Sequence, residues 1–275
     1  MKSVRDVETD IKNLTIQGAT NVALAVLDTL EKYPDKSVGE RVAYARPTEP
    51  LAQNAIRYIF SGNDTKKRIQ QYKSFIMDAT KSIPENGKHL LKSGGTYLTL
   101  CHSQTTIDLI QKARAEGAKF RMFVAETRPL YQGRTTATEL ISLGFNDVTM
   151  VTDSVAFALL ENNTFDAVFL GADLITESGF VNKVGSLAAT TIANLHAIPV
   201  FCASTLLKFS PKPIRIEERN PNEIWESPPE GLKFYAPAFD YIPFTPNVRV
   251  VCEDGILLGE DIALAVKKRY LFIME

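Results

Sequence analysis

Beyond Gly95 the chain alternates short apolar runs with longer helix-like stretches, and this pattern restricts the fold more than any other feature of the sequence. Alternating strands and helices form βαβ units, which predict a parallel sheet. The runs are continuously apolar, so we expect both faces of the sheet to be covered. The predicted strands are TYLTL (96–100), KFRMFVA (119–125), VTMV (148–151), AVFLGA (167–172), IPVFCA (198–203) and VRVVCE (248–253), and helices are predicted near 104–116, 135–143, 154–161, 184–197 and 260–269.

The chain before Gly95 is predicted to be helical. Apolar residues recur at helical spacing in TNVALAVLDTLEKY, in LAQNAIRYIF and in a long third segment around 69–83. We therefore predict an α/β protein with a helical N-terminal domain over 1–94 and a second domain with a mostly parallel sheet over 95–275. The proline-rich stretch 211–246 is expected to form a long ordered excursion from that second domain.

Local signals predict where some helices begin and end. Pro84 is expected to interrupt the long third helix, because proline lacks the N–H that a helix interior needs. Thr136 with Glu139 has the spacing of a capping box. Asp153 is expected to be the N-cap of the helix that follows it.

Composition and charge exclude several classes of protein. The formal net charge is -1 and the pI about 6.4, so we expect no direct nucleic-acid partner, which usually requires a basic surplus. The three cysteines lack disulfide-like spacing and fit a reducing compartment. The scattered histidines predict no metal site, and no cofactor is indicated. The charged N-terminus and short apolar runs predict a cytoplasmic protein without a membrane partner.

Polar residues follow the predicted strands at the point where each strand ends. In an open parallel sheet, ligands bind outside the carboxyl ends of the strands. A loop that only turns the chain does not need cysteine, arginine, aspartate and lysine at successive strand ends. We therefore predict a pocket for a small phosphorylated ligand, built from CHSQTT (101–106), ETRPLYQGR (126–134), GADLI (171–175) and STLLK (204–208).

Cys101 and Asp173 are the candidate reactive residues. Cys101 directly precedes a predicted helix, whose positive end favours a thiolate that acts as base or nucleophile. The alternative is a small buried apolar residue, which is the common role of a free cysteine. Asp173 is either a catalytic carboxyl or a turn former. Asn182 and Lys183 have the groups to hold a sugar hydroxyl and a phosphate, unless Lys183 is a solvated loop residue.

Further candidates are suited to binding phosphate. Arg46 and Arg128 each precede a proline, which holds them extended, and a fixed guanidinium is a good phosphate ligand; the alternative for both is surface charge. The segment Gln17-Gly18-Ala19-Thr20 opens the first long helix, where unpaired N–H groups face an anion. Ser103, Gln104 and Lys208 complete the predicted ligand-binding set.

Together these segments resemble one superfamily. It unites the α, β and δ subunits of translation initiation factor 2B with isomerases that act on methylthioribose 1-phosphate and on ribose 1,5-bisphosphate, among which the archaeal bisphosphate isomerases are most similar. The resemblance spans nearly the whole chain, and ETRP…QG and GAD…NK are its most specific parts. The matching stretches are IQGA (16–19), ARPT (45–48), LCHSQ (100–104), ETRPLYQG (126–133), GADLI (171–175), VNKVGS (181–186), LKFSP (207–211) and PAFDYIP (237–243).

The resemblance implies a helical N-terminal domain, a Rossmann-like C-terminal domain, and a homodimer or higher oligomer formed through the C-terminal domains. In the isomerases of this superfamily a cysteine accepts a proton and an aspartate donates one; by position these are Cys101 and Asp173. The initiation-factor subunits generally lack this pair, so its presence favours an enzyme.

Two departures from the isomerase pattern affect phosphate binding. Gln17 stands where the isomerases have the arginine of Arg-Gly-Ala, and Gln104 stands where the bisphosphate isomerases have lysine. Each lost cation removes a charge-assisted hydrogen bond, and two losses weaken binding of a bisphosphate by roughly two to four decades. We therefore predict a ligand with less phosphate charge, or binding without efficient turnover.

Three functions remain open from the sequence. The first is aldose–ketose isomerisation of a sugar 1-phosphate. The second is a regulatory subunit that binds initiation factor 2 or a nucleoside monophosphate-like effector without catalysis. The third is a metabolite-binding oligomer of unknown output.

Overall fold

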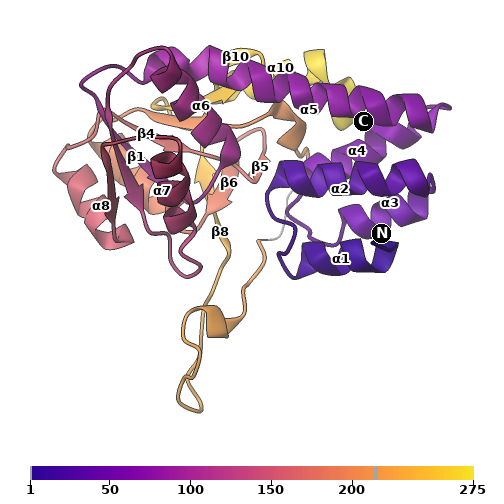
Figure 1. Ribbon diagram of the computed structural model, residues 1–275, viewed down its shortest axis with the longest axis horizontal. Helices are drawn as coiled ribbons and strands as arrows, with labels where there is room; N and C mark the ends of the chain where they lie inside the picture. Colours follow the sequence, from indigo (N-terminus) through magenta and orange to yellow (C-terminus); the bar gives the residue numbers. More distant parts are fainter. Residues whose placement is uncertain (1, 213–215) are drawn as a thin grey trace.

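Helices form one lobe of the molecule in the computed structural model, which describes residues 2–212 and 216–275 (Figure 1). Ser3 caps the first helix with a capping box, and Asp35 and Asp64 cap the third and fifth through their carboxylates. The first and third helices are short and mostly polar, which is why apolar periodicity did not predict them. The helices are α1 (Val4–Lys12), α2 (Ala19–Lys32), α3 (Lys36–Ala43), α4 (Pro50–Phe60) and α5 (Thr65–Gly87).

Helix α5 contacts both lobes. Pro84 lies inside the helix without ending it, so the predicted interruption is wrong; the helix continues to Gly87. A Cβ at Gly87 would lie 2.4 Å from Leu109 and 2.8 Å from Val251, because α5 crosses the second lobe closely at this point. One cluster of buried apolar residues runs from α2 and α4 into the second lobe. The division at 94/95 stays a prediction.

A seven-stranded sheet forms the centre of the second lobe, within the described residues. Its strand order is β10-β9-β7-β4-β1-β2-β3, and every neighbouring pair is parallel except β10 with β9. The predicted mostly parallel, Rossmann-like sheet is therefore confirmed. Its strands are β1 (Thr96–Leu100), β2 (Arg121–Ala125), β3 (Val148–Val151), β4 (Ala167–Leu170), β7 (Val200–Ala203), β9 (Val248–Cys252) and β10 (Gly255–Leu258), with helices α6 (Gln104–Ala115), α7 (Gln132–Ser142), α8 (Asp153–Glu161), α9 (Ser186–Leu195) and α10 (Ile262–Arg269).

Two predicted caps are wrong. Helix α7 begins at Gln132, so Thr136 lies inside it, and its hydroxyl donates to the Cys101 carbonyl at 2.7 Å. Thr152 occupies the N-cap position of α8, and Asp153 is the first helical residue. The Asp153 carboxylate instead accepts the backbone N–H of Thr127, which fixes the turn after β2.

A second, antiparallel sheet was not predicted. It has the order β5-β6-β8 and is built from β5 (Leu174–Ile175), β6 (Gly179–Lys183) and β8 (Phe239–Pro243). In its register Asn182 pairs with Asp240, and Lys183 pairs with Phe239. Both predicted ligand-binding residues therefore lie on a buried strand rather than in a loop.

The proline-rich excursion is ordered over its described part. The chain projects away from the body of the molecule before it returns as β8, as the orange segment of Figure 1 shows. A one-turn 3-10 helix, Pro221–Glu223, lies within it, and Trp225 and Tyr235 are exposed along it. Among the described residues, no helix is both long and apolar enough to cross a bilayer.

Candidate active site

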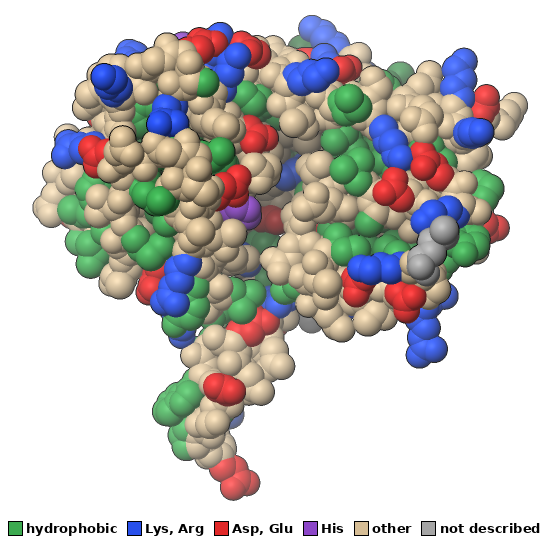
Figure 2. Space-filling model, in the orientation of Figure 1, with side chains coloured by type: hydrophobic (Ala, Val, Ile, Leu, Met, Phe, Trp, Pro, Cys, Tyr) green, Lys and Arg blue, Asp and Glu red, His purple; other side chains and the backbone are tan. Residues whose placement is uncertain are grey.

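A pocket of about 550 Å³ lies between the two lobes, where the carboxyl ends of β1 and β4 face the first turn of α2. The hollow is visible between the lobes in Figure 2. The fold brings together in this pocket every predicted site residue except Arg128. The predicted residues that line the pocket are Gln17, Gly18, Ala19, Thr20, Arg46, Cys101, Ser103, Gln104, Asp173, Asn182, Lys183 and Lys208.

Cys101 is the first residue after β1, and its backbone is left-handed, with φ of 71°. Its N–H donates to the Thr127 hydroxyl at 2.8 Å, and its carbonyl accepts the Thr136 hydroxyl. A non-glycine residue in this conformation costs free energy and is typical of functional positions. Two threonines from neighbouring elements thus hold Cys101 in a fixed, unfavourable conformation beside the pocket.

The protonation of Cys101 differs from the sequence-based expectation. Burial raises the pKa of the thiol to about 11; Lys183 opposes this rise and Asp173 adds to it. The expected lowering of this pKa is not found, because burial has the largest effect on it. Helix α6 begins only at Gln104, where the Ser103 hydroxyl accepts one of its first N–H groups. Lys183 is the cation that favours the thiolate.

Asp173 lies beyond the end of β4, where its backbone N–H donates to the Val181 carbonyl at 2.8 Å. Burial raises the pKa of its carboxyl, against the charges of Lys208, Lys183 and Arg46. A carboxyl that donates a proton near neutral pH needs a raised pKa, so this direction fits a proton donor. The Asp173 carboxyl can thus carry a proton at a higher pH than an exposed aspartate.

The two predicted lysines, Lys183 and Lys208, line the pocket and are held by neighbouring groups. Lys183 is only 7% exposed and lies 4.6 Å from the centre of the Phe239 ring, so the alternative of a solvated loop residue is wrong. Lys208 donates to the Ala172 carbonyl at 2.6 Å. Asn182 donates to the Ser186 hydroxyl at the start of α9, which orients its amide.

The two predicted arginines have different environments. Arg46 lies in the pocket between the carboxylates of Glu49, at 2.9 Å, and Glu217, at 3.2 Å. Its Nε is buried without a hydrogen-bond partner among the described residues. Arg128 lies outside the lining: its guanidinium donates to the Tyr131 hydroxyl and, at 3.0 Å, to the Ile224 carbonyl. Arg128 therefore anchors the projecting segment, and its role in binding phosphate stays a prediction that its place outside the lining does not support.

The start of α2 matches its prediction. Gly18 is the N-cap, with φ of 83°, and no side chain caps the first N–H groups of this helix. A helix N-terminus of this kind offers N–H groups to an anion. The Asn21 side chain donates to the Gln17 carbonyl at 2.9 Å, which secures the turn before the helix.

Sequence reasoning missed several charged or polar lining residues. Burial raises the pKa of the Glu49 carboxyl to about 7; Arg46 opposes this rise and Asp173 adds to it. A carboxylate before Pro50, three residues after Arg46, was a signal that could have found Glu49. Gln132 lay within a strand-end segment that was already selected. No local signal marks the remaining residues with charged carboxylate or guanidinium side chains, which are Asp108, Glu217 and Arg219.

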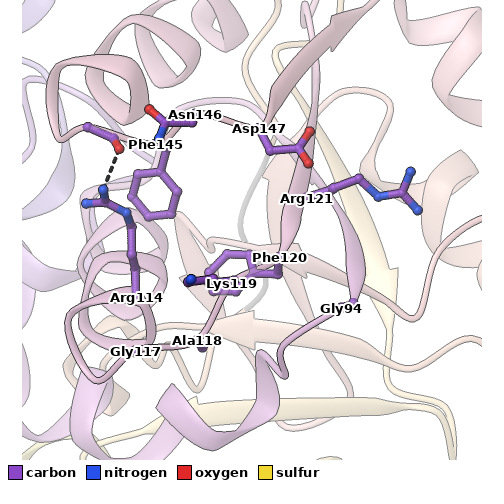
Figure 3. A pocket seen from close by; sticks show the side chains of 12 residues that line it. Gly94, Arg114, Gly117, Ala118, Lys119, Phe120, Arg121, Phe145, Asn146 and Asp147 are labelled. Atoms are coloured by element: carbon purple, nitrogen blue, oxygen red, sulfur yellow. Dashed lines mark hydrogen bonds between the residues drawn. The ribbon is translucent and has the colours of Figure 1, made fainter.

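A larger hollow, of about 830 Å³, lies at the opposite edge of the sheet, beside the amino ends of β1 and β2 (Figure 3). Arg114 points into it and donates to the Leu143 and Gly144 carbonyls, and one of these bonds is drawn in Figure 3. Its guanidinium also lies 4.8 Å from the Phe145 ring centre. The Arg114 guanidinium is thus occupied by hydrogen bonds at the end of α7. The candidate reactive residues, Cys101 and Asp173, line the smaller pocket instead.

Comparison with known proteins identifies the family of this chain. A sequence model described as the initiation factor 2 subunit family matches residues 15–258. The chain belongs to the initiation factor 2 subunit family. Ribose 1,5-bisphosphate isomerase from Methanocaldococcus jannaschii is 32% identical over 286 residues, which cover 94% of this chain and 92% of that protein. Methylthioribose-1-phosphate isomerase from Thermotoga petrophila is 32% identical, over 81% of this chain and 74% of that protein.

Solved structures show the same fold in the initiation factor 2 subunit family. The translation initiation factor eIF-2B of Pyrococcus horikoshii OT3 superposes with a TM-score of 0.80 at 24% identity, over 93% of this chain and 96% of that chain. At this level of identity the likeness concerns the fold. It covers both lobes, so the helical lobe and the Rossmann-like lobe occur together in this relative too.

Proposed function

We propose that this protein catalyses aldose–ketose isomerisation of a sugar 1-phosphate. The observation that carries the proposal is that Cys101 and Asp173 line one pocket, where Asp173 raises the pKa of Cys101 and Lys183 lowers the pKa of both groups. Proton transfer between neighbouring carbons requires one group that acts as a base and another that acts as an acid. Sugar-phosphate isomerases of the same family are 32% identical to this chain, which supports the proposal.

The reaction needs two proton carriers. Asp173, protonated, donates to the ring oxygen, and the bond between that oxygen and C1 breaks. The Cys101 thiolate takes the proton from C2, so that a C1–C2 double bond forms. The C2 hydroxyl then returns its proton to Asp173, and C1 receives the proton held by Cys101. Substrate and product are isomers, and both side chains regain their starting protonation states.

The surrounding groups have roles in binding. The uncapped start of α2 and the ammonium groups of Lys183 and Lys208 provide donors for phosphate and hydroxyl oxygens. Arg46 is shared by two carboxylates, so less of its charge is available to the ligand. This arrangement supports a ligand with one phosphate group rather than two.

A second candidate is a regulatory subunit that binds a nucleoside monophosphate-like effector or initiation factor 2 without catalysis. Two observations favour it: Gln17 and Gln104 replace cations, and the Cys101 thiol has a pKa of about 11. Both observations reduce the expected rate of an isomerase.

The oligomer is also part of this proposal. Val155 on α8 and Leu187 and Leu195 on α9 are exposed apolar residues on adjacent helices of the C-terminal lobe. They support contact between copies of the chain, as the family resemblance implies. The three cysteines are free, which supports a reducing, cytoplasmic setting.

Turnover tests the proposal against the second candidate. Wild type, Cys101→Ser and Asp173→Asn are incubated with ribose 1-phosphate, methylthioribose 1-phosphate, ribose 1,5-bisphosphate and nucleoside monophosphates, and ketose formation is followed by NMR. We expect at least one sugar phosphate to turn over, and Cys101→Ser to lower the rate at least about a hundredfold. Cys202→Ala, at a buried cysteine outside the pocket, is the matched control. Full turnover in Cys101→Ser excludes the mechanism, whereas binding without turnover favours the regulatory subunit.

A further inference from the structure

One end of the pocket is acidic. Gln104 and Asp108 lie one turn apart on α6, and Glu139 faces them from α7. The Gln104 amide nitrogen donates to the Asp108 carboxylate at 2.9 Å and to the Glu139 carboxylate at 3.0 Å. His102 lies beside them, with its Nε2 3.8 Å from Glu139. His102, Gln104 and Asp108 belong to the pocket lining, and Glu139 is joined to it through Gln104; we call these four residues the acidic end of the pocket.

No cation balances these carboxylates within the described part of the chain. Asp108 forms no ion pair there, and Glu139 is paired with His102 alone. Burial lowers the pKa of His102, although Glu139 opposes this, so the imidazole is neutral at neutral pH. Burial also raises the pKa of Asp108, and Glu139 adds to the rise. The four cations of the pocket lining belong to other segments: Arg46, Lys183, Lys208 and Arg219.

The hydrogen-bonding groups of the acidic end are mostly acceptors. Both N–H groups of the Gln104 amide are used by the two carboxylates, so its carbonyl oxygen remains for a ligand. The Gln132 side-chain oxygen, which belongs to the lining, is buried without a donor among the described residues. A buried acceptor without a donor is unfavourable until a ligand supplies one. Within the described residues this end of the pocket therefore holds no cation for a phosphate, and its carboxylates and the Gln104 carbonyl oxygen are acceptors for N–H or O–H groups.

We propose that the acidic end binds the substituent of the sugar remote from the 1-phosphate, and that it selects a hydrogen-bond donor there, an amine or a hydroxyl, against a second phosphate. The inference rests on the proposed function, because it takes the ligand to be a sugar 1-phosphate. A phosphate carries close to two negative charges and only acceptor oxygens at neutral pH. An ammonium group has three donors and the opposite charge.

The inference orders three ligands by affinity. We expect 5-amino-5-deoxyribose 1-phosphate to bind most tightly, ribose 1-phosphate less tightly, and ribose 1,5-bisphosphate at least about tenfold more weakly than ribose 1-phosphate. Binding is measured by isothermal titration with Cys101→Ser, which keeps the acidic end intact and suppresses turnover.

A charge-removal variant tests whether the two carboxylates cause this order of affinities. In Asp108→Asn with Glu139→Gln, on the Cys101→Ser background, we expect the affinity for the bisphosphate relative to ribose 1-phosphate to rise at least about tenfold, and the preference for the amine to disappear. The matched control is Glu177→Gln with Glu260→Gln, which removes the same charge from two exposed residues whose side chains form no hydrogen bond with the described residues. Thermal unfolding verifies that each variant is folded.

The outcomes separate the two proposals. Tighter binding of the bisphosphate than of ribose 1-phosphate overturns the inference and leaves the isomerase proposal in place, provided that the wild type turns over a sugar phosphate. An unchanged ratio of affinities in the charge-removal variant also overturns the inference alone. Binding of none of the three sugar phosphates overturns both.

Discussion

Lys183 is predicted to control the reactivity of Cys101, and Lys183→Met tests this. The pKa of Cys101 is about 11, so at pH 8 about one molecule in a thousand holds a thiolate. Lys183 is the charged group that lowers this pKa most. Two unit charges about 6 Å apart at an effective dielectric constant of about 20 interact by about 3 kcal/mol. Loss of that charge therefore reduces the thiolate population about a hundredfold.

The rate change is smaller than the population change. A more basic thiolate is a better nucleophile, with a Brønsted coefficient of about 0.4–0.5 for thiol–disulfide exchange. The greater reactivity of each thiolate offsets nearly a factor of ten of the hundredfold fall in thiolate population. The observed rate with a disulfide reagent is therefore expected to fall about tenfold. The assay is exchange with 4,4′-dithiodipyridine at pH 8, with the rate of Cys101→Ser subtracted to remove the other two cysteines.

Two variants serve as controls for the Lys183 experiment. Lys183→Arg keeps the charge and is expected to keep most of the rate. Lys208→Met removes a pocket charge that acts on Asp173 rather than directly on Cys101, so its effect is expected to stay within about threefold. An equal loss of rate in Lys183→Met and Lys208→Met, or no loss in either, refutes the assigned role of Lys183.

Two further predictions concern stability. The buried Glu49 carboxyl, with a pKa of about 7, holds its proton more tightly in the folded protein, so its contribution to the free energy of unfolding falls by about 3 kcal/mol as pH rises from about 4.5 to about 7. Glu49→Gln removes that fall, as urea unfolding at pH 5 and pH 8 measures; an unchanged pH dependence contradicts it. Asn54 donates to the Leu207 and Phe209 carbonyls at 2.8 and 2.9 Å, so Asn54→Ala is expected to cost about 3 kcal/mol in urea unfolding. The neighbouring Gln53→Ala is the control, and equal losses in the two variants contradict the prediction.

The strand ends could be predicted from the sequence because their signals are local. Each parallel strand is a continuous apolar run that stops at a polar residue, and topology brings those stops to one edge of the sheet. Cys101 and Asp173 were found in this way. Lys183 lines the same pocket, but its place on a buried strand was not predicted, because β6 pairs with β8 across more than fifty residues of chain and such pairing leaves no local periodicity.

Electrostatics could not be predicted from residue types alone. The sequence indicates that Arg46 is a cation, but not that Glu217, far away in the chain, shares it. It indicates that Cys101 precedes a helix, but not that burial raises the pKa of its thiol. The acidic end was missed for the same reason, since Glu139 approaches Gln104 only when α6 and α7 pack together. These properties depend on distances between segments.

The position of α5 has a consequence for how members of this family can exchange parts. The helix lies before Gly94 in sequence, yet its C-terminal half packs on α6 and β9 of the other lobe. A recombination joint at the apparent boundary would therefore transfer a helix without the surface that it evolved to cover. A chimaera that joins the first 94 residues of this chain to the second lobe of a relative would therefore need small enough partners for Gly87 at the positions of Leu109 and Val251.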